Sequence, residues 1–431
     1  MSYSEELSKA LSAAGAAEGA LVEVSSNGRT HRGVLMPHHE FSSPDAVVLK
    51  LGSGYNIGVR MAEGSSIRVE SPPPERRPAR AEAHRSEGLP RIAIIGTGGT
   101  IASYVDYRTG AVHPAMTAEE LVSAVPELRG AADLRARALF SVFSENMGVR
   151  HWQILAEAVA EELNAGADAA IIPHGTDTMG YTAAALSFML EGLGKPVVLV
   201  GAQRSSDRPS SDAPSNLSAA LRLCLEGGRA GVFVVMHDGL SDDSFAAHAG
   251  TRVRKMHTSR RDAFRSVNAK PVARIGADGI SFSCPGSPAH GGRVSARCAM
   301  EERTVLLQYY PGMDPAVFGP VFEGSRGIVI AGSGLGHVGE AMVPLIKKAR
   351  ENGSVVAIAS QCLGGSTNLN VYSTGRDMLS AGAIPVGDML PETAYVKLMW
   401  ALANSGSAEE AERIMAAPLA SESGDRRETD V

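Results

Sequence analysis

The hydrophobic and polar positions of residues 20–70 follow a different pattern from those of the rest of the chain. Five short runs rich in β-branched residues succeed one another there with little helical periodicity between them, which predicts five strands. Asn27-Gly28 separates the first two runs and favours the positive φ angles of a tight hairpin turn. Such short, closely spaced strands predict a small β-barrel; the alternative is an extension without a binding role. The runs are residues 21–25, 30–36, 46–51, 56–61 and 66–70.

From Arg91 onward, apolar runs alternate with segments of helical periodicity. This alternation predicts an α/β protein with a mostly parallel sheet that helices cover on both faces. The predicted strands begin at Arg91 and occupy residues 139–143, 169–173, 196–200, 231–236, 327–332 and 355–360. One helix is predicted to begin at a capping box formed by Thr117 and Glu120, and a second has an apolar face from Trp152 to Leu163. Further helices are predicted at about residues 179–190, 213–225, 340–351, 376–381 and 393–403. Residues 238–303 are predicted to be a loop-rich basic region.

The composition of residues 73–90 differs from that of both flanking regions. They are rich in proline and charge and contain almost no large apolar side chain, so they cannot bury enough surface to fold and are predicted to be a linker. The chain then divides into a small β-barrel domain (1–72), this linker, a larger α/β domain (91–300), a smaller α/β domain (301–418) and a polar tail (419–431). The polarity of the tail predicts a frayed end.

Composition narrows the functional classes. Apolar residues make up 44% of the 431 residues and charged residues 20%, which is typical of a globular protein. No window reaches the ~20 apolar residues of a membrane span, and the N-terminus does not have the pattern of a secretory signal, so we expect a cytoplasmic protein without a membrane partner. A formal net charge of −6 argues against an autonomous nucleic-acid binder. The four cysteines have no CxxC spacing, and we expect neither disulfides nor a metal site.

Polar side chains follow two of the predicted strands. Thr97 and Thr100 lie in the glycine-rich turn after the first strand of the α/β region, and Thr176 and Asp177 follow the strand at 169–173. In α/β sheets, ligands bind beyond the carboxyl ends of the strands. We therefore expect these residues to share one site.

A threonine hydroxyl is a poor nucleophile unless a neighbouring base takes its proton. Lys255 is a candidate base because its flanking arginines would favour the neutral amine, although spacing alone favours a solvated basic loop. His174 is another candidate, but a lone histidine at a strand end is more often structural. Ser144-Glu145, after the run at 139–143, either grips the polar ends of an amino acid or forms a capping turn.

Two glycine-rich stretches partly match the dinucleotide-binding pattern GxGxxG. In GTGGTI, Gly96 and Gly98 match its first two glycines, but Ile101 stands at the third position. In GSGLGHVG, His337 stands there instead. The chain also contains no Walker sequence. We therefore expect no nucleotide cofactor bound by this chain.

Taken together, these motifs resemble those of the bacterial-type asparaginases. TGGTIA at residues 97–102 and HGTDT at 174–178 are similar to the two threonine signatures of that family, and the block around Lys255 is similar to its lysine block. The resemblance runs from Arg91 to roughly Ala403. It implies an asparaginase-like two-domain parallel-sheet core, and it favours a site role for Lys255 over a solvated loop.

The resemblance also implies roles for individual residues. Thr100 is expected to be the nucleophile that forms an acyl-enzyme, while Thr176, Lys255 and Asp177 form a proton relay with Lys255 as base. The sequence leaves open which threonine is acylated. The remaining expected site residues are Ser144 and Glu145 for gripping the substrate, Tyr107 as a lid, and the backbone N–H groups of Gly98, Gly99 and Gly175 for the oxyanion.

Within that family, the chain resembles the archaeal D subunits of glutamyl-tRNA(Gln) amidotransferase. The N-terminal barrel, which free asparaginases lack, YPGMDP at 310–315 and the block from Ser366 to Trp400 carry this resemblance. It implies that the chain hydrolyses glutamine or asparagine as amide donor and passes ammonia to an E subunit. That partner would bind tRNA(Gln) and use ATP and Mg²⁺ to activate the misacylated glutamate.

The resemblance further implies a homodimer through the asparaginase-like core and a heteromeric assembly of two D and two E chains. One alternative is a free-standing L-asparaginase, which has no need of the N-terminal barrel. Another is an inactive scaffold, which has no use for Thr100, Thr176, Asp177 and Lys255 together.

Overall fold

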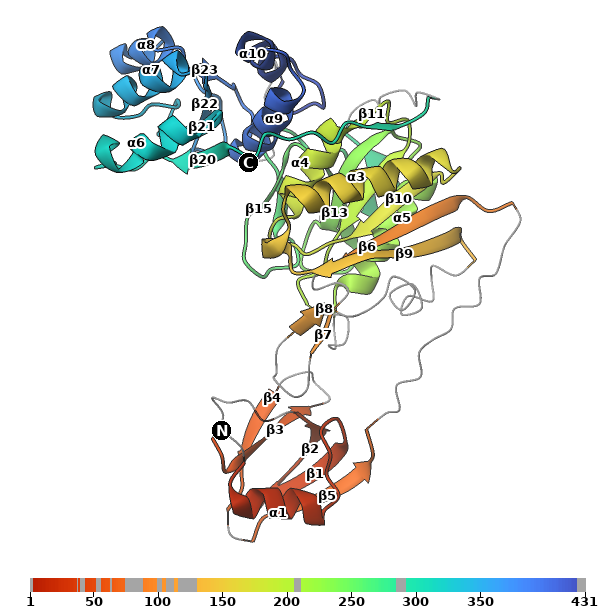
Figure 1. The fold of residues 1–431 in the computed structure, drawn as a ribbon. Coiled ribbons are helices and arrows are strands. Elements are labelled where there is room, and N and C mark those ends of the chain that lie inside the picture. Colours follow the sequence, from red (N-terminus) through yellow and green to blue (C-terminus); the bar gives the residue numbers. More distant parts are fainter. Residues whose placement is uncertain are drawn as a thin grey trace.

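The computed structural model describes residues 3–36, 38, 43–51, 56–62, 64–73, 88–98, 103–105, 112–114, 130–204, 211–283 and 292–424. The predictions for Gly99, Thr100, Tyr107 and the capping box at Thr117 and Glu120 lie outside these ranges. Figure 1 shows a small N-terminal sheet, a large central sheet and a smaller C-terminal sheet in chain order. Within the described ranges, no helix is long and apolar enough to cross a membrane.

The N-terminal sheet contains the five predicted strands. It is antiparallel in the order β4-β3-β2-β1-β5, and Figure 1 shows it curled around its own core. The predicted hairpin turn is present, with φ angles of 51° at Asn27 and 71° at Gly28. Helix α1, which we did not predict, adds Leu7 and Leu11 to that core. The elements are α1 (Glu5–Ala13), β1 (Leu21–Ser26), β2 (Arg29–Leu35), β3 (Ala46–Leu51), β4 (Asn56–Arg60) and β5 (Ser66–Ser71).

The central sheet has the order β18-β17-β14-β13-β12-β10-β6-β9. The five strands β13, β12, β10, β6 and β9 are parallel to one another, as predicted. The strands β14, β17 and β18 extend the sheet in antiparallel pairs. The carboxyl ends of β6, β9 and β10 therefore meet at one edge. The strands are β6 (Arg91–Gly98), β9 (Asp133–Val142), β10 (Ala169–Pro173), β12 (Pro196–Val200), β13 (Gly231–His237), β14 (Ser244–Ala249), β17 (Ala273–Gly276) and β18 (Gly279–Phe282), with a separate hairpin of β7 (Ser103–Val105) and β8 (Val112–Pro114).

Alternate residues of the parallel strands face two different cores. On β10, Ala170 and Ile172 join the core under α3 (Val149–Asn164) and α4 (Met179–Met189), whereas Ala169 and Ile171 join the core under α5 (Ala213–Glu226). Strands that are buried on both faces are apolar throughout, which made β10 and β12 recognisable. The edge strand β9 is half-exposed and begins at Asp133, so our prediction of residues 139–143 found only its second half.

Residues 238–303 are not the loop-rich region that we predicted. Their described part contains β14, β17 and β18 of the central sheet and three shorter strands. These strands are short and mix polar with apolar residues, so no long apolar run marks them. The three shorter strands are β15 (Val253–Lys255), β16 (Phe264–Ser266) and β19 (Ser295–Ala296), which pairs with β11 (Leu190–Glu191).

The C-terminal sheet is parallel in the order β20-β21-β22-β23. Helices α6, α7 and α8 cover one face, and α9 and α10 cover the other. The predicted strands at 327–332 and 355–360 are confirmed, whereas β20, β23, α6 and α10 were not predicted. The elements are β20 (Thr304–Gln308), α6 (Pro315–Gly324), β21 (Gly327–Gly332), η4 (Glu340–Met342), α7 (Val343–Glu351), β22 (Val355–Ser360), α8 (Ser373–Ser380), β23 (Ile384–Pro385), α9 (Pro391–Ala403) and α10 (Ala408–Ala416).

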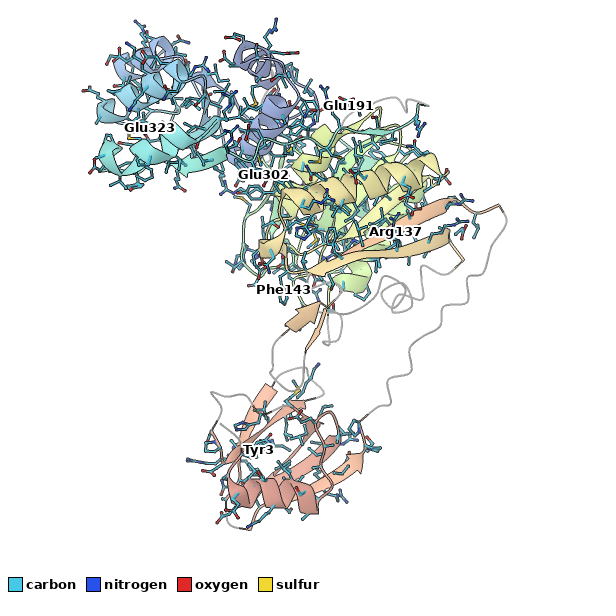
Figure 2. All side chains as sticks on the ribbon, viewed as in Figure 1. Tyr3, Arg137, Phe143, Glu191, Glu302 and Glu323 are labelled. Carbon is cyan, nitrogen blue, oxygen red and sulfur yellow. The ribbon has the colours of Figure 1, made fainter. Side chains whose placement is uncertain are left out.

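Helix α9 joins the two α/β units. Leu398 packs in the core of the smaller sheet, while Val396 and Trp400 pack in a core of the larger one. The Trp400 ring stacks on Phe188 of α4, with 6.2 Å between the ring centroids. In Figure 2, the label of Glu302 marks this junction. The two sheets thus share one helix.

The polar tail is packed at residues 419–424, so our prediction of fraying is wrong for these residues, and residues 425–431 lie outside the described ranges. Glu422 and Lys397 are both fully buried and form an ion pair with 2.5 Å between Oε1 and Nζ. The Glu422 carboxylate also accepts hydrogen bonds from the backbone N–H groups of Leu419 and Ala420. Composition misled us because the partner of this carboxylate lies outside the tail, on α9.

Candidate active site

Hydrogen bonds join three side chains at the carboxyl edge of the central sheet. Lys255 Nζ donates to Thr176 Oγ1 over 2.8 Å and to Asp177 Oδ1 over 2.7 Å. Thr176 and Asp177 follow β10, and Lys255 is the last residue of β15. The Lys255 side chain is 13% exposed and Thr176 is buried, whereas the Asp177 side chain is 68% exposed. A ligand can therefore approach the group from the side of Asp177.

Two glycines leave room for the turn that carries Thr176. A Cβ atom at Gly201 would lie 2.7 Å from Thr176 Cγ2, and one at Gly175 would lie 2.7 Å from Ser144 Cβ. Carbon atoms in favourable contact are about 3.5–4.0 Å apart. Thr176 and Ser144 can occupy their positions only because residues 201 and 175 have no side chain.

Ser144 lies against this turn at the start of η3 (Ser144–Asn146), directly after Phe143, which Figure 2 labels. Its side chain is buried, and its carbonyl accepts a hydrogen bond of 2.6 Å from Thr178 Oγ1. Glu145 is exposed. This geometry is compatible with the substrate-gripping interpretation and with the capping turn alike.

His174 and Thr97 make buried contacts behind the same edge. Burial lowers the pKa of His174 to about 4, so the ring is neutral at neutral pH and its Nδ1–H donates to Gly175 O over 2.6 Å. Thr97 Oγ1 donates to Pro173 O over 2.8 Å and so connects β6 to β10. Neither of these two hydrogen bonds involves Lys255, Thr176 or Asp177, which fits the structural interpretation of His174.

Carboxylates neutralise the basic stretch around Lys255. Arg252 is only 4% exposed, and its guanidinium lies 2.9 Å from Asp388. The other ion pairs join Arg254 to Glu392, Arg260 and Arg265 to Asp262, and Arg261 to Asp242. The alternative of a solvated basic loop is therefore wrong for this stretch.

A buried polar network lies behind the site and was not predicted from the sequence. Asn216 Nδ2 donates to Gly201 O over 3.0 Å and to Asp212 Oδ2 over 3.2 Å, and Asn216 Oδ1 lies 2.7 Å from His237 Nδ1. The network thus holds Gly201, the residue that packs against Thr176. Its only sequence signal is a pair of polar residues, Asp212 and Asn216, one helical turn apart at the start of an apolar helix.

The glycine-rich stretch at residues 332–339 lies within the described ranges, whereas GTGGTI at residues 96–101 lies partly outside them. Within the described ranges, no cluster of three or more His, Cys, Asp or Glu side chains could hold a metal ion. The glycine-rich stretch after β21 folds back on itself, with a hydrogen bond of 2.8 Å from Ser333 N to His337 O. Gly334 and Gly336 have φ angles of 53° and 103° there. These glycines serve a tight turn after β21.

Three family models match the chain. Residues 91–285 match the N-terminal domain of asparaginase, and residues 303–415 match the C-terminal domain of glutaminase/asparaginase. Residues 16–69 match the GatD N-terminal domain. Together these matches extend over the three sheets described above.

Several curated proteins, each named as the D subunit of glutamyl-tRNA(Gln) amidotransferase, are similar to this chain over most of its length. The protein from Pyrococcus furiosus is 51% identical over 402 residues, which cover 91% of this chain and 90% of the relative. The protein from Methanothermobacter thermautotrophicus is 45% identical and covers 99% of this chain, with 98% of its own length matched.

Solved structures of asparaginases share the fold. The thermostable L-asparaginase from Thermococcus kodakarensis superposes with a TM-score of 0.71 at 31% identity, covering 78% of this chain and 100% of the other. L-asparaginase I from Vibrio cholerae superposes with a TM-score of 0.68 at 28% identity, again covering 78% of this chain and 99% of the other.

Proposed function

Because this chain belongs to the family of glutamyl-tRNA(Gln) amidotransferase D subunits, we propose that it hydrolyses the side-chain amide of glutamine or asparagine and releases ammonia. The observation that carries the chemistry is the position of Lys255 Nζ between Thr176 Oγ1 and Asp177 Oδ1. A threonine nucleophile needs a neighbouring base and a group that orients this base. Lys255 is the base in this proposal, and Asp177 orients it.

In the proposed reaction, the Thr100 hydroxyl oxygen attacks the amide carbon and gives up its proton to the relay. Thr176 Oγ1 passes a proton to Lys255 Nζ, and the Asp177 carboxylate stabilises the ammonium that forms. The relay returns the proton to the amide nitrogen as the C–N bond breaks, which releases ammonia and leaves an ester on Thr100. Water then hydrolyses the ester to the free acid.

The other site residues take supporting roles in this proposal. The exposed carboxylate of Asp177 is available to the amino group of the substrate, and Ser144 and Glu145 bind its polar ends. The backbone N–H groups of Gly99 and Gly175 stabilise the oxyanion, and Tyr107 closes over the substrate. The close approach of Ser144 to Gly175 supports the placement of Ser144 in the site.

We also propose that the ammonia passes to a partner E subunit. That partner holds tRNA(Gln) and uses ATP and Mg²⁺ to activate the misacylated glutamate, and the two chains form a heteromeric assembly. The net charge of −6 and the absence of a Walker sequence from this chain support such a division, since both nucleic-acid binding and phosphate chemistry are then supplied by the partner.

The test is ammonia release from glutamine and from asparagine, first by this chain alone and then with the E subunit, Glu-tRNA(Gln) and ATP·Mg²⁺. Strong stimulation by the complete mixture, with Gln-tRNA formed, is the expected result. Fast hydrolysis of asparagine by the lone chain, unchanged by every addition, would overturn the coupled function in favour of a free-standing L-asparaginase. Lys255→Met and Thr100→Val serve as inactive controls. If the complete mixture with wild-type protein releases no ammonia, the chain is an inactive scaffold and the proposal is wrong.

A further inference from the structure

The position of Lys255 depends on a very short strand. β15 has three residues, and in the described part of the chain its ladder partner is the three-residue strand β16, outside the eight-stranded central sheet. A pair of strands this short is at best marginally stable by itself. The lysine that contacts Thr176 and Asp177 therefore needs support from outside its own strand.

Two arginines provide that support, Arg252 directly before β15 and Arg254 within it. Arg254 alternates with Lys255, so in the extended strand it points to the opposite side from the lysine. Arg252 Nη1 lies 2.9 Å from Asp388 Oδ2, and Arg254 Nε lies 3.2 Å from a Glu392 carboxylate oxygen. Both carboxylates belong to the smaller α/β unit. The strand that carries the lysine is thus held from behind by the other unit.

Arg252 has a second partner in the carboxyl-terminal segment, which we define as residues 419–424. Arg252 Nε donates to Ser421 O over 2.8 Å, and the neighbouring Thr251 Oγ1 donates to Ala420 O over 2.8 Å. Gly424 N donates to the other carboxylate oxygen of Asp388 over 3.2 Å. The fixed fork of the guanidinium thus makes two bonds at once, which a lysine ammonium at this position would not reproduce with the same geometry.

A buried ion pair fixes the carboxyl-terminal segment. Lys397 and Glu422 are fully buried, and Lys397 Nζ also donates to Met415 O and Ala417 O. Burial lowers the pKa of Lys397, and the Glu422 carboxylate opposes this shift. Ser421 adopts a φ of 59°, an unusual conformation for a residue other than glycine. The segment thus holds the Ser421 carbonyl toward Arg252 at a conformational cost that the ion pair offsets.

We infer that Arg252 is a positioning residue for Lys255, and that the carboxyl-terminal segment, through Glu422, holds Arg252 in place. This inference rests on the proposed role of Lys255 in amide hydrolysis. The competing explanation is that these contacts only strengthen the junction between the two units. In that case their loss lowers stability but leaves the turnover of the folded enzyme unchanged.

The two explanations separate in steady-state kinetics of glutamine hydrolysis by the full chain with its E subunit, Glu-tRNA(Gln) and ATP·Mg²⁺. Arg252→Lys keeps the charge next to Asp388 but loses the fork, and Glu422→Gln keeps the volume but loses the ion pair. We expect kcat to fall about ten-fold or more in each, with KM within about two-fold of wild type, because a small misplacement of the lysine affects the reaction more than binding.

Glu412→Gln is the matched control. It breaks the ion pair between Arg350 and Glu412, which also lies in the smaller unit but is not one of the ion pairs that hold β15. Its kcat should equal that of the wild type. Should Arg252→Lys or Glu422→Gln fail to fold, a chain that ends at Pro418 and carries Lys397→Met removes the segment without leaving an unpaired buried charge. Unchanged kcat in the folded variants overturns the inference.

Lys255→Met, assayed in parallel, distinguishes this inference from the proposed function. If Lys255→Met retains normal turnover, Lys255 takes no part in the relay and both proposals fail. If Lys255→Met is inactive while Arg252→Lys and Glu422→Gln turn over normally, the proposed chemistry stands and only the positioning role is refuted.

Discussion

Gly201→Ala should disable the site without changing any residue of the proposed relay. An ideal Cβ at residue 201 lies 2.7 Å from Thr176 Cγ2, 3.1 Å from His174 O and 3.4 Å from Met179 Cε. Because carbon atoms in contact need about 3.5–4.0 Å, the methyl group must push Thr176 away by about 1 Å. The backbone of β10 is paired on both sides, so the turn at Thr176 is the part that can yield.

A displacement of that size stretches the 2.8 Å hydrogen bond between Thr176 Oγ1 and Lys255 Nζ beyond a normal length. We expect kcat for amide hydrolysis to fall about 100-fold, since a misplacement of about 1 Å is worth that much in a positioned site. The free energy of unfolding should fall by about 1–3 kcal/mol from overpacking alone. The assay is ammonia release by protein whose folded fraction is fixed by circular dichroism and urea unfolding.

Two controls separate the site from general overpacking. Gly239→Ala adds the same methyl group in open space at the same end of the central sheet and should change nothing. Gly33→Ala places a methyl group 2.6 Å from Lys50 O in the N-terminal sheet, away from Thr176 and from α9, and should lower stability while kcat is retained. Full activity in a folded Gly201→Ala protein would refute the argument, because Thr176 would then not need its present position for turnover.

Three further outcomes can be checked with purified protein. Thr100→Val should fold normally and lose amide hydrolysis, because it removes only a hydroxyl; retained ammonia release would move the nucleophile to Thr176. Thr97→Val removes the buried bond to Pro173 O and should lower the free energy of unfolding by about 1 kcal/mol with little change in KM, measured by urea unfolding and kinetics. His174 has a folded pKa of about 4 against an ordinary 6.5, so the unfolded chain takes up its proton first as the pH falls. As the pH falls from 6.5 to about 4, the free energy of unfolding should therefore decrease by about 1.4 kcal/mol per pH unit because of His174. His174→Asn should remove this contribution to the pH dependence. An unchanged pH dependence in the variant would contradict the lowered pKa of His174.

The fold was predictable where burial on both faces made the sequence uniformly apolar. β10 and β12 are apolar at every position because each face of the strand packs on a helix layer. β9 lies at the edge of the sheet, and arginines alternate with its apolar residues in the first half of the strand. The hydrophobic pattern therefore revealed only the end of the strand. The strands of two to six residues between 244 and 296 offered too few positions for a period to emerge.

The site was predictable only in part from local pattern. Thr176 and Asp177 stand next to a clear strand, and the rule for parallel sheets places them at a ligand-binding edge. Lys255 comes from a strand of three residues, 78 positions from Asp177. Its flanking arginines made it a candidate base, but only the family resemblance favoured that role over a solvated loop. The long-range pair of Lys397 with Glu422 left no local signal, and the composition of the tail favoured the wrong prediction.

The two halves of the Lys255 group thus have different supports. Thr176 is fixed from within the larger sheet, by the parallel strands on either side of β10 and by its contact with Gly201. Asn216 in turn holds Gly201 by a hydrogen bond to the Gly201 carbonyl. Lys255 is held within the larger unit by the pairing of β15 with β16 and by the burial of Val253, and from the smaller unit through Arg252 and Arg254 and their carboxylate partners. If Arg252 positions Lys255 as we infer, the bond of 2.8 Å between Lys255 and Thr176 depends on how the two units dock along α9. Turnover would then depend on the junction between the units as well as on the residues at the sheet edge, and substitutions at the two supports should differ in kind, overpacking at one and loss of a buried ion pair at the other.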